Sequence, residues 1–234
     1  MKISDGVTSY VEKKQAGSSH WLIRHWLAEY KPGTKLLDVG AASGMLGQSV
    51  AESGFILTGV EPDRNWARTA RPYYQKFWEG TVEEAAPETI AGQDVVILAD
   101  ILEHLSSPEA VLKYLFALQP AGCVFIISVP NVANIFVRFN LLLGRFDYQE
   151  RGILDRTHLR FFTRRTFLNL LNLTSLEILE SKVTPVPLEL VNPFFENSFV
   201  GRSIYNGLYH LTKLFPTLLG YQFVVKAQKP AGKS

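Results

Sequence analysis

Cysteine is almost absent from this 234-residue sequence, in which Cys123 stands alone. A single thiol excludes an internal disulfide framework and a zinc site built on cysteines. A long hydrophobic run is missing too, because the longest uncharged stretch, residues 114–137, is broken by Pro120, Gly122 and Pro130. It therefore predicts no membrane-spanning helix. The first 14 residues have five charges and no apolar core, so we expect no secretory signal and a cytoplasmic location.

A strong charge of one sign is missing from the whole chain but not from its halves. The formal net charge is +2. Residues 35–134 hold six basic and twelve acidic side chains, whereas residues 135–234 hold thirteen basic and seven acidic ones. The basic half hints at an anionic substrate or surface. Solvated arginines that pair with the acidic half explain the same counts, and both interpretations stay open.

The order of apolar runs predicts an α/β fold. In the first half, short apolar runs alternate with helical patterns, which is typical of βαβ units and a mostly parallel sheet. We expect strands at residues 35–39, 56–61, 76–79, 94–99, 123–129, 176–183 and 221–227. Helices are expected at residues 45–53, 64–71, 108–118 and 164–173, and Ser19 is expected to cap a further helix before the first strand. Thr163 would cap the helix at 164–173, and Phe162 and Phe167 would form its hydrophobic staple.

The length fits a single domain, residues 1–234, in three parts. Residues 1–34 form an N-terminal helical cap, 35–135 a ligand-binding core, and 136–234 a second half with a helical insert at 184–220 before the last strand. The insert holds an apolar stripe of Val200, Ile204, Leu208, Leu211 and Phe215. Such a stripe packs on its own domain, forms a dimer interface or lies on a membrane surface.

Residues 36–47, LLDVGAASGMLG, are the most informative segment. A strand ends in a turn of small residues and a helix begins, so a ligand can approach the backbone and the orphan N–H groups of the helix. A dinucleotide site would need glycine at positions 40, 42 and 45. Ala42 and Met45 occupy two of these positions, which argues against NAD or FAD.

The spacing instead resembles the first motif of the class I S-adenosylmethionine-dependent methyltransferases, an acid followed by x-Gly-x-Gly-x-Gly. Four further segments resemble that family in the same order: GVEPD at 59–63, GTVE at 80–83, DILEHLSSP at 100–108 and LQPAG at 118–122. The resemblance implies a Rossmann-like, doubly wound, seven-stranded, mostly parallel sheet with helices on both faces. It also implies S-adenosyl-L-methionine as cofactor, bound by Asp38, Gly40, Ala41, Ala42, Gly44, Glu61, Pro62, Thr81, Val82, Asp100 and Ile101. Glu61 would take the ribose hydroxyls.

Two histidines lie in segments that resemble acceptor-side motifs. LDRTHLRFFT, residues 154–163, resembles a loop bordering the acceptor pocket of bacterial small-molecule and glycan methyltransferases. His158 is a candidate general base, with Asp155 to orient it, and Arg156 and Arg160 would bind an anionic group of the substrate. His104 is the second candidate base. Glu103 and His104 resemble a pair that helps to hold a divalent metal in ubiquinone-type O-methyltransferases; only that pair matches, so we assign no metal.

These features predict an S-adenosylmethionine-dependent enzyme that O-methylates a sugar or a lipid-linked saccharide. A small aromatic or quinone-type hydroxyl is the alternative acceptor, and a non-catalytic S-adenosylmethionine-binding protein is the alternative class. Nucleic acid is not an expected partner, because VPN at residues 129–131 is unlike the family signature for exocyclic amines. A homodimer and peripheral contact with the inner face of the membrane remain open.

Overall fold

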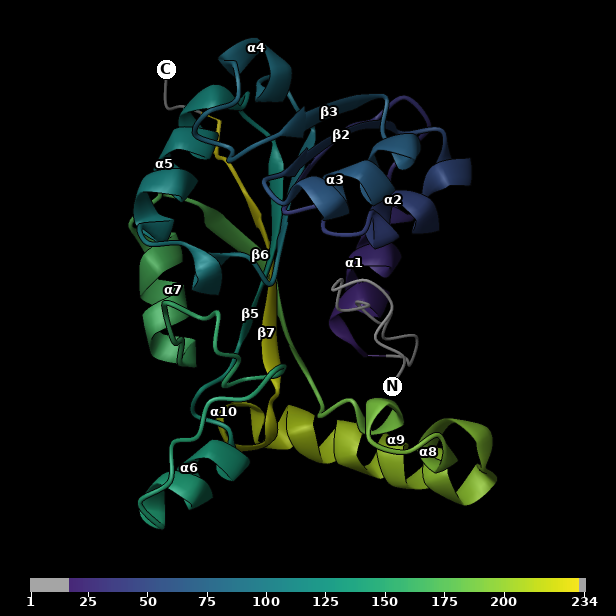
Figure 1. Ribbon diagram of the computed structural model, residues 1–234, viewed down its shortest axis with the longest axis vertical. Coiled ribbons are helices and arrows are strands. Elements are labelled where there is room, and N and C mark those ends of the chain that lie inside the picture. Colours follow the sequence, from purple (N-terminus) through teal and green to yellow (C-terminus); the bar gives the residue numbers. More distant parts are fainter. Residues whose placement is uncertain (1–16, 232–234) are drawn as a thin grey trace.

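The computed structural model describes residues 17–231 and is built on one seven-stranded sheet (Figure 1). Strands β1 (Lys35–Val39), β2 (Ile56–Glu61), β3 (Lys76–Glu79), β4 (Val95–Ala99) and β5 (Val124–Pro130) are parallel. Strand β7 (Gln222–Gln228) runs antiparallel between β5 and β6 (Glu177–Thr184), giving the order β3-β2-β1-β4-β5-β7-β6. The expected Rossmann-like, mostly parallel sheet is confirmed. Residues 1–16 of the expected N-terminal cap lie outside the described residues.

Helices cover both faces of the sheet and create two hydrophobic cores. Helices α1 (Ser19–Leu27) and α3 (Arg64–Ala70) pack on one face, while α5 (Pro108–Leu118) and α7 (Arg164–Asn172) pack on the other. Successive strand residues alternate between the cores, so Leu36 belongs to the first and Leu37 to the second. Both are fully buried, as expected for a parallel sheet covered on both sides.

Several boundaries differ from the expectation by a few residues. Ser18, not Ser19, caps α1, because its Oγ accepts the N–H of Trp21. The expected 45–53 helix is split into α2 (Met45–Ser49) and a 3-10 turn, η1 (Ala51–Ser53). Thr163 caps α7 as expected, in a capping box with Thr166, and the Phe162 and Phe167 rings are 6.2 Å apart.

The remaining elements are short, apart from one long helix. They are η2 (Arg71–Tyr73), α4 (Pro87–Ile90), η3 (Leu102–His104), α6 (Ile135–Leu142), η4 (Leu188–Leu190), α8 (Phe194–Asn197), α9 (Phe199–Leu214) and α10 (Pro216–Leu219). Figure 1 shows α6, α8, α9 and α10 at one end of the molecule, below the sheet. Helix α6 was not expected from the sequence. Among residues 17–231, no helix has the length and apolarity needed to cross a membrane.

Helix α9 turns its apolar stripe away from the protein. Its buried residues are Gly201, Tyr205 and Thr212. Four of the five stripe residues, Val200, Ile204, Leu211 and Phe215, are instead exposed. Packing on its own domain, one of the three interpretations of the stripe, therefore does not apply to these four side chains.

Gly44 is required both by backbone conformation and by packing. It has φ +81° at the start of α2, and a Cβ there would lie 2.7 Å from the backbone Cα of Ala70 in α3. A flexible side chain could move aside, but the backbone of a packed helix cannot. This glycine therefore sets how closely the first loop approaches α3.

We expect Gly44→Ala to lower the free energy of unfolding by more than the ~1–2 kcal/mol that a left-handed conformation costs a non-glycine residue. The excess comes from displacing Ala70. Denaturant unfolding measures the loss. Gly92→Ala is the matched control, because Gly92 has φ +69° and open space around its Cβ position. Equal losses in the two variants would show that the contact with Ala70 has no weight.

Candidate functional site

The carboxyl ends of β1 and β2 are joined by the carboxylate of Glu61. One of its oxygens accepts the N–H of Ala42 at 2.8 Å and the other accepts the N–H of Asp63 at 2.9 Å. Burial raises the pKa of this carboxyl, while the two backbone donors oppose the rise. Each oxygen retains a lone pair, so the carboxylate can still accept hydroxyl donors from a ligand. Ala42 adopts φ +46°, which places its N–H toward Glu61 at the cost of some strain.

Asp38 lies beneath this loop and does not face solvent. It is buried at the end of β1 and accepts the hydroxyl of Tyr74 at 2.5 Å. Burial raises its pKa to about 6, against the opposing effect of the Tyr74 hydrogen bond. Tyr74 was not identified from the sequence, because it lies in no motif. The hydrogen bond therefore connects β1 to the residue that follows η2.

The remaining expected cofactor residues are arranged around the same edge of the sheet. Gly40, at φ +77°, lies against Ile101, since a Cβ there would be 2.0 Å from the Ile101 Cδ1 atom. The Thr81 N–H donates to Glu84 at 3.1 Å. Val82 is buried, whereas Pro62 is exposed. Ala41 is buried in the first core.

Asp100 has an uncommon backbone conformation and is held firmly. Its φ is +56°, its carboxylate accepts the Ser128 hydroxyl at 2.6 Å, and the Gln222 side-chain amide donates to its other oxygen. Ser128 lies in β5 and Gln222 in β7. The sheet itself therefore fixes this carboxylate at the end of β4. Non-glycine residues with positive φ persist where surrounding contacts enforce them.

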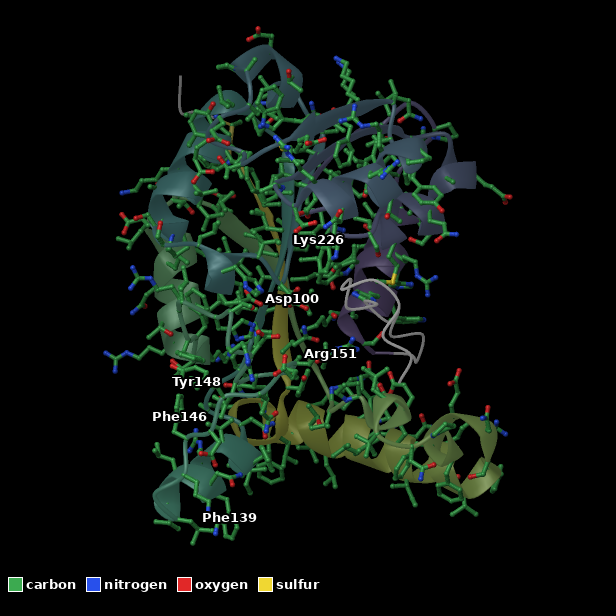
Figure 2. The ribbon with its side chains drawn as sticks, in the orientation of Figure 1. Asp100, Phe139, Phe146, Tyr148, Arg151 and Lys226 are labelled. Carbon is green, nitrogen blue, oxygen red and sulfur yellow. The ribbon has the colours of Figure 1, made fainter. Side chains whose placement is uncertain are left out.

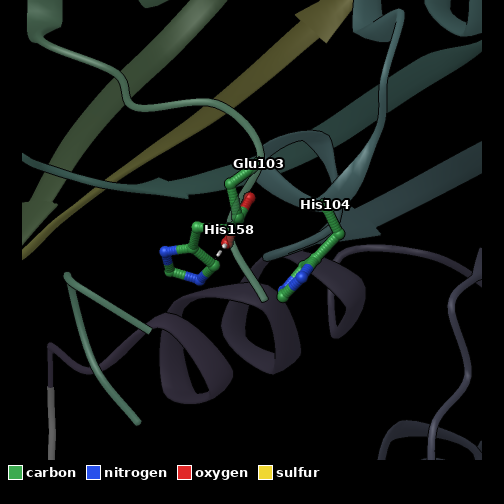
Figure 3. A group of neighbouring side chains, drawn as sticks. All are labelled: Glu103, His104 and His158. Atoms are coloured by element: carbon green, nitrogen blue, oxygen red, sulfur yellow. Dashed lines mark ion pairs between the residues drawn. The ribbon is translucent and has the colours of Figure 1, made fainter. Parts of the chain in front are cut away.

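His104 and His158 are brought together from segments 54 residues apart in sequence. Their ring centroids are 4.8 Å apart (Figure 3). Nδ1 of His158 lies 3.1 Å from the carbonyl of Ile153, and Nδ1 of His104 lies 3.3 Å from the carbonyl of Thr157. A carbonyl only accepts, so Nδ1 is the donor in each ring, and in the neutral form of each ring Nε2 is the acceptor. In that form, Nε2 of each ring can accept a proton.

His158 is the more enclosed of the two. Its side chain is buried, and its Nε2 lies 4.0 Å from the Glu103 carboxylate. Burial lowers the pKa of His158, and the neighbouring His104 lowers it further. The ring is therefore neutral at pH 7, which is the state a general base requires.

Asp155 does not orient His158 in the way that we expected. Its carboxylate accepts both the N–H and the hydroxyl of Thr157, at 2.9 and 2.6 Å. The Thr157 hydroxyl oxygen in turn lies 3.2 Å from Nδ1 of His104. Asp155 thus reaches His104 through Thr157, while the Ile153 carbonyl holds His158. Spacing alone suggested a carboxylate–imidazole pair, but the tight turn directs the carboxylate back to its own backbone.

The loop that holds His158 is fixed to the end of β4. The carbonyl of Glu103 accepts the N–H groups of Leu159 and Arg160 at 2.8 and 2.9 Å. The Arg160 guanidinium donates to the Ser106 carbonyl, and Arg156 pairs with Glu150. Both arginine side chains thus have partners within the chain. Their role in binding an anionic substrate stays a prediction.

Glu103, His104 and His158 also form a set of metal-binding groups. One ligand atom from each lies within 4.8 Å of the others. A carboxylate and two imidazoles suit a divalent transition metal. The donor set therefore fits such an ion, which would lower the pKa of a bound hydroxyl.

A series of aromatic rings, also unforeseen from the sequence, leads away from the histidine pair. The ring centroids of His158 and Phe161 are 6.2 Å apart. The Phe161 centroid lies 5.7 Å from that of Phe146 and 6.4 Å from that of Tyr148. Phe146 and Tyr148 follow α6 and are exposed. Phe146 and Tyr148 flank Asp147 and lie in no motif, so no sequence feature indicated them.

One large hollow lies away from this edge of the sheet. An open hollow of about 720 Å³ is lined by Glu29, Gly33, Asp94 and Gly122, among others. Those residues precede or flank the amino ends of β1, β4 and β5. Ligands of open α/β sheets bind at the carboxyl ends, so we assign that hollow no role.

Comparisons with known proteins agree with the motifs. A family model described as a methyltransferase domain matches residues 10–181. A ubiquinone biosynthesis O-methyltransferase of Vibrio campbellii is 33% identical over 100 residues, which cover 40% of this chain and 43% of that protein. The homologous protein of Aeromonas salmonicida is 32% identical over 133 residues, covering 54% and 55%. The chain thus spans about half, or less, of the length of these relatives.

Solved structures show the same fold. A SAM-dependent methyltransferase of Archaeoglobus fulgidus superposes with a TM-score of 0.57 at 18% identity, covering 90% of this chain and 92% of that one. Magnesium protoporphyrin IX methyltransferase of Synechocystis, solved with bound SAH, gives 0.61 at 14% identity, covering 90% and 82%. With the family match over most of its length, the chain belongs to the class I S-adenosylmethionine-dependent methyltransferases, and S-adenosyl-L-methionine is the cofactor of that family.

Proposed function

We propose that this protein transfers a methyl group from S-adenosylmethionine to a hydroxyl of a sugar or lipid-linked saccharide. The observation that carries an oxygen acceptor is the His104–His158 pair, which holds two basic Nε2 atoms beside the carboxyl edge of the sheet. An alcohol needs a base to lose its proton as it attacks, whereas an amine or thiolate needs less help. The proposal that the acceptor is a saccharide is supported by the loop at residues 154–163 and by the aromatic and basic residues around it.

A quinone-type or small aromatic hydroxyl is the second candidate acceptor. It is favoured by the names of the curated relatives, which are ubiquinone biosynthesis O-methyltransferases. Phe161, Phe146 and Tyr148 would stack on an aromatic ring as readily as on a sugar face. A non-catalytic binding protein is the third candidate, and an observed methyl transfer would exclude it.

In the proposed mechanism, the cofactor supplies an activated sulfonium methyl group when it is bound. Glu61 would bind the ribose, and the backbone of the loop at residues 40–44 would hold the amino-acid part. Nε2 of His158 accepts the hydroxyl proton of the acceptor. The Ile153 carbonyl holds the opposite side of the ring, so that Nε2 points away from that carbonyl. His104, held by Thr157, is the alternative base on the other side of the pair.

A split assay with methyl-labelled S-adenosylmethionine tests the acceptor class. The enzyme is offered a lipid-extractable saccharide fraction and, separately, a catechol that carries a quinone-type tail. We expect label in the saccharide. Label in the catechol alone would replace the first candidate by the second, and label in neither, with cofactor binding intact, would favour the binding protein.

Replacing Glu61 by alanine should weaken cofactor binding. A charged hydrogen-bond acceptor for two hydroxyls is worth about 1.5–3 kcal/mol, so we expect a ~10–100-fold higher Kd for S-adenosylmethionine and S-adenosylhomocysteine by calorimetry. Glu52→Ala, at an exposed carboxylate of η1, is the control. A thermal melt without ligand separates loop unfolding from lost contacts. Unchanged affinity in a folded Glu61→Ala protein would refute the assigned cofactor site.

Replacing His158 by alanine should lower kcat by about 10²–10⁴-fold while the Kd for the cofactor stays within a few-fold. His158→Gln separates the two roles of the ring, since glutamine forms hydrogen bonds but does not accept the proton. His104→Ala is the matched variant on the other ring. If it shows the defect instead, the base is His104. If EDTA abolishes turnover and Co²⁺ restores it, the pair acts with Glu103 as metal ligands rather than as a base.

The lowered pKa of His158 predicts a specific pH dependence. A general base acts in its neutral form. The midpoint of the acid limb of kcat/KM should therefore lie at a pH below the ordinary imidazole pKa of about 6.5. Between the two pKa values the unfolded chain binds more protons than the folded one, so the free energy of unfolding rises with pH through that window. Denaturant unfolding from pH 5 to 7 should show this rise, and His158→Gln should reduce it. An acid limb above pH 7 would contradict the enclosed ring.

A further inference from the structure

Helix α6 is apolar on nearly every side and projects from the end of β5. Val137 is its only buried residue. Its side chains and those that follow are largely exposed, Leu142 to 82% and Phe139 to 59%. The exposed apolar residues of this segment are Ile135, Phe136, Phe139, Leu141, Leu142, Leu143 and Phe146. Folding alone does not explain them, because a helix that is apolar all round is normally buried.

Helix α9 adds a second exposed apolar row at the same end of the molecule (Figure 1). Its outward residues are Phe199, Val200, Ile204, Leu211 and Leu214, with Phe215 directly after it. We call the exposed side chains of residues 135–146 and 199–215 the docking face. Figure 2 shows Phe139 at the lower end, on this face, with Phe146 and Tyr148 above it in the direction of Asp100. Many exposed apolar side chains gathered at one end of a molecule mark an interaction site.

The charges on the docking face all have one sign. Arg138 and Arg145 lie on the α6 segment, and Arg202 and Lys213 on α9. Residues 135–146 and 199–215 contain no aspartate or glutamate. All four cations are exposed. Apolar side chains mixed with cations, and with no acidic residue, are the pattern of helices that lie in a membrane interface.

We propose that the docking face binds the surface of an anionic lipid bilayer. Phe139, Leu142 and Ile204 would enter the acyl boundary, and the four cations would meet the lipid phosphates. A second copy of the chain fits less well, because a symmetric contact would bring like charges together. Helix α9 has 16 residues and α6 has eight, so each lies along the interface and neither crosses it.

Binding to a bilayer would bring the enzyme to a lipid-linked acceptor, and this role rests on the proposed function. A lipid-linked acceptor would be taken up beside α6, where Phe146 and Tyr148 begin the ring series that leads through Phe161 to His158. Binding to the bilayer itself needs neither cofactor nor acceptor. A failure to bind vesicles is therefore distinguishable from a failure of the acceptor assignment.

Vesicle flotation of the full chain tests the proposal. We expect the protein to float with vesicles of phosphatidylcholine mixed with phosphatidylglycerol, and about tenfold less with phosphatidylcholine alone. Salt at about 1 M should remove the difference, since the screening length falls to ~3 Å. Phe139→Asp with Ile204→Asp should reduce binding at least about tenfold, and Arg145→Glu with Arg202→Glu should remove the preference for the anionic lipid.

Leu173→Asp is the matched control, because Leu173 is 57% exposed beyond α7 and outside the docking face. It should bind as the unchanged protein does. Equal loss in this control, equal binding to both lipids, or binding to neither would overturn the proposal. Sedimentation velocity without vesicles tests the competing occupant: a dimer that Phe139→Asp dissociates would assign the face to a second copy. Circular dichroism of each variant confirms that it is folded.

Discussion

The parallel pairing of β1, β2, β4 and β5 is the constraint on which the rest of the structure depends. Parallel strands end at the same edge of a sheet, so the loops after β1, β2 and β4 must meet there. The Glu61 carboxylate connects two of these loops, because it accepts hydrogen bonds from the loop after β1 and from the turn after β2. Asp100, after β4, is held by Ser128 on the neighbouring strand and Gln222 on β7. The antiparallel β7, near the end of the sequence, thus helps to fix a residue that follows β4.

Much of this edge was predictable from the sequence because its elements obey local rules. The Val, Ile and Leu runs of β1 and β2 gave the strand bounds as observed, and Thr163 gave the start of α7. The turn at residues 40–44 was recognisable because left-handed backbone favours glycine. Ala42 departs from that rule, and its φ of +46° shows that the conformation is kept even where the residue disfavours it. The bond between the Ala42 N–H and Glu61 is a contact that helps to hold it.

The histidine pair could be predicted only in part, because side-chain contacts depend on backbone geometry that spacing does not fix. His104 and His158 were recognisable in the sequence. The backbone hydrogen bonds from Leu159 and Arg160 to Glu103, which bring the two rings together, were not. Asp155 was expected beside His158, whereas the turn brings its carboxylate to the N–H and hydroxyl of Thr157. Helix α6 was not predicted, because a run of apolar residues after a strand can be read as part of the strand or as a loop. The orientation of α9 was likewise undecided, since periodicity locates an apolar stripe but not what it faces.

The uneven charge of the two halves now has a physical interpretation. The acidic half contains Glu61 and Asp100, whose carboxylates are fixed by backbone and side-chain donors at the carboxyl edge of the sheet. The basic half contains α6 and α9, which carry exposed cations as well as exposed apolar side chains. Exposed phenylalanine and leucine oppose solubility unless another surface covers them. In the proposed arrangement the lipid covers them, and the ring series from Tyr148 to His158 leads from that surface to the basic nitrogens. An enzyme whose acceptor stays anchored in the bilayer needs this geometry, because the acceptor hydroxyl then reaches the methyl group without leaving the membrane.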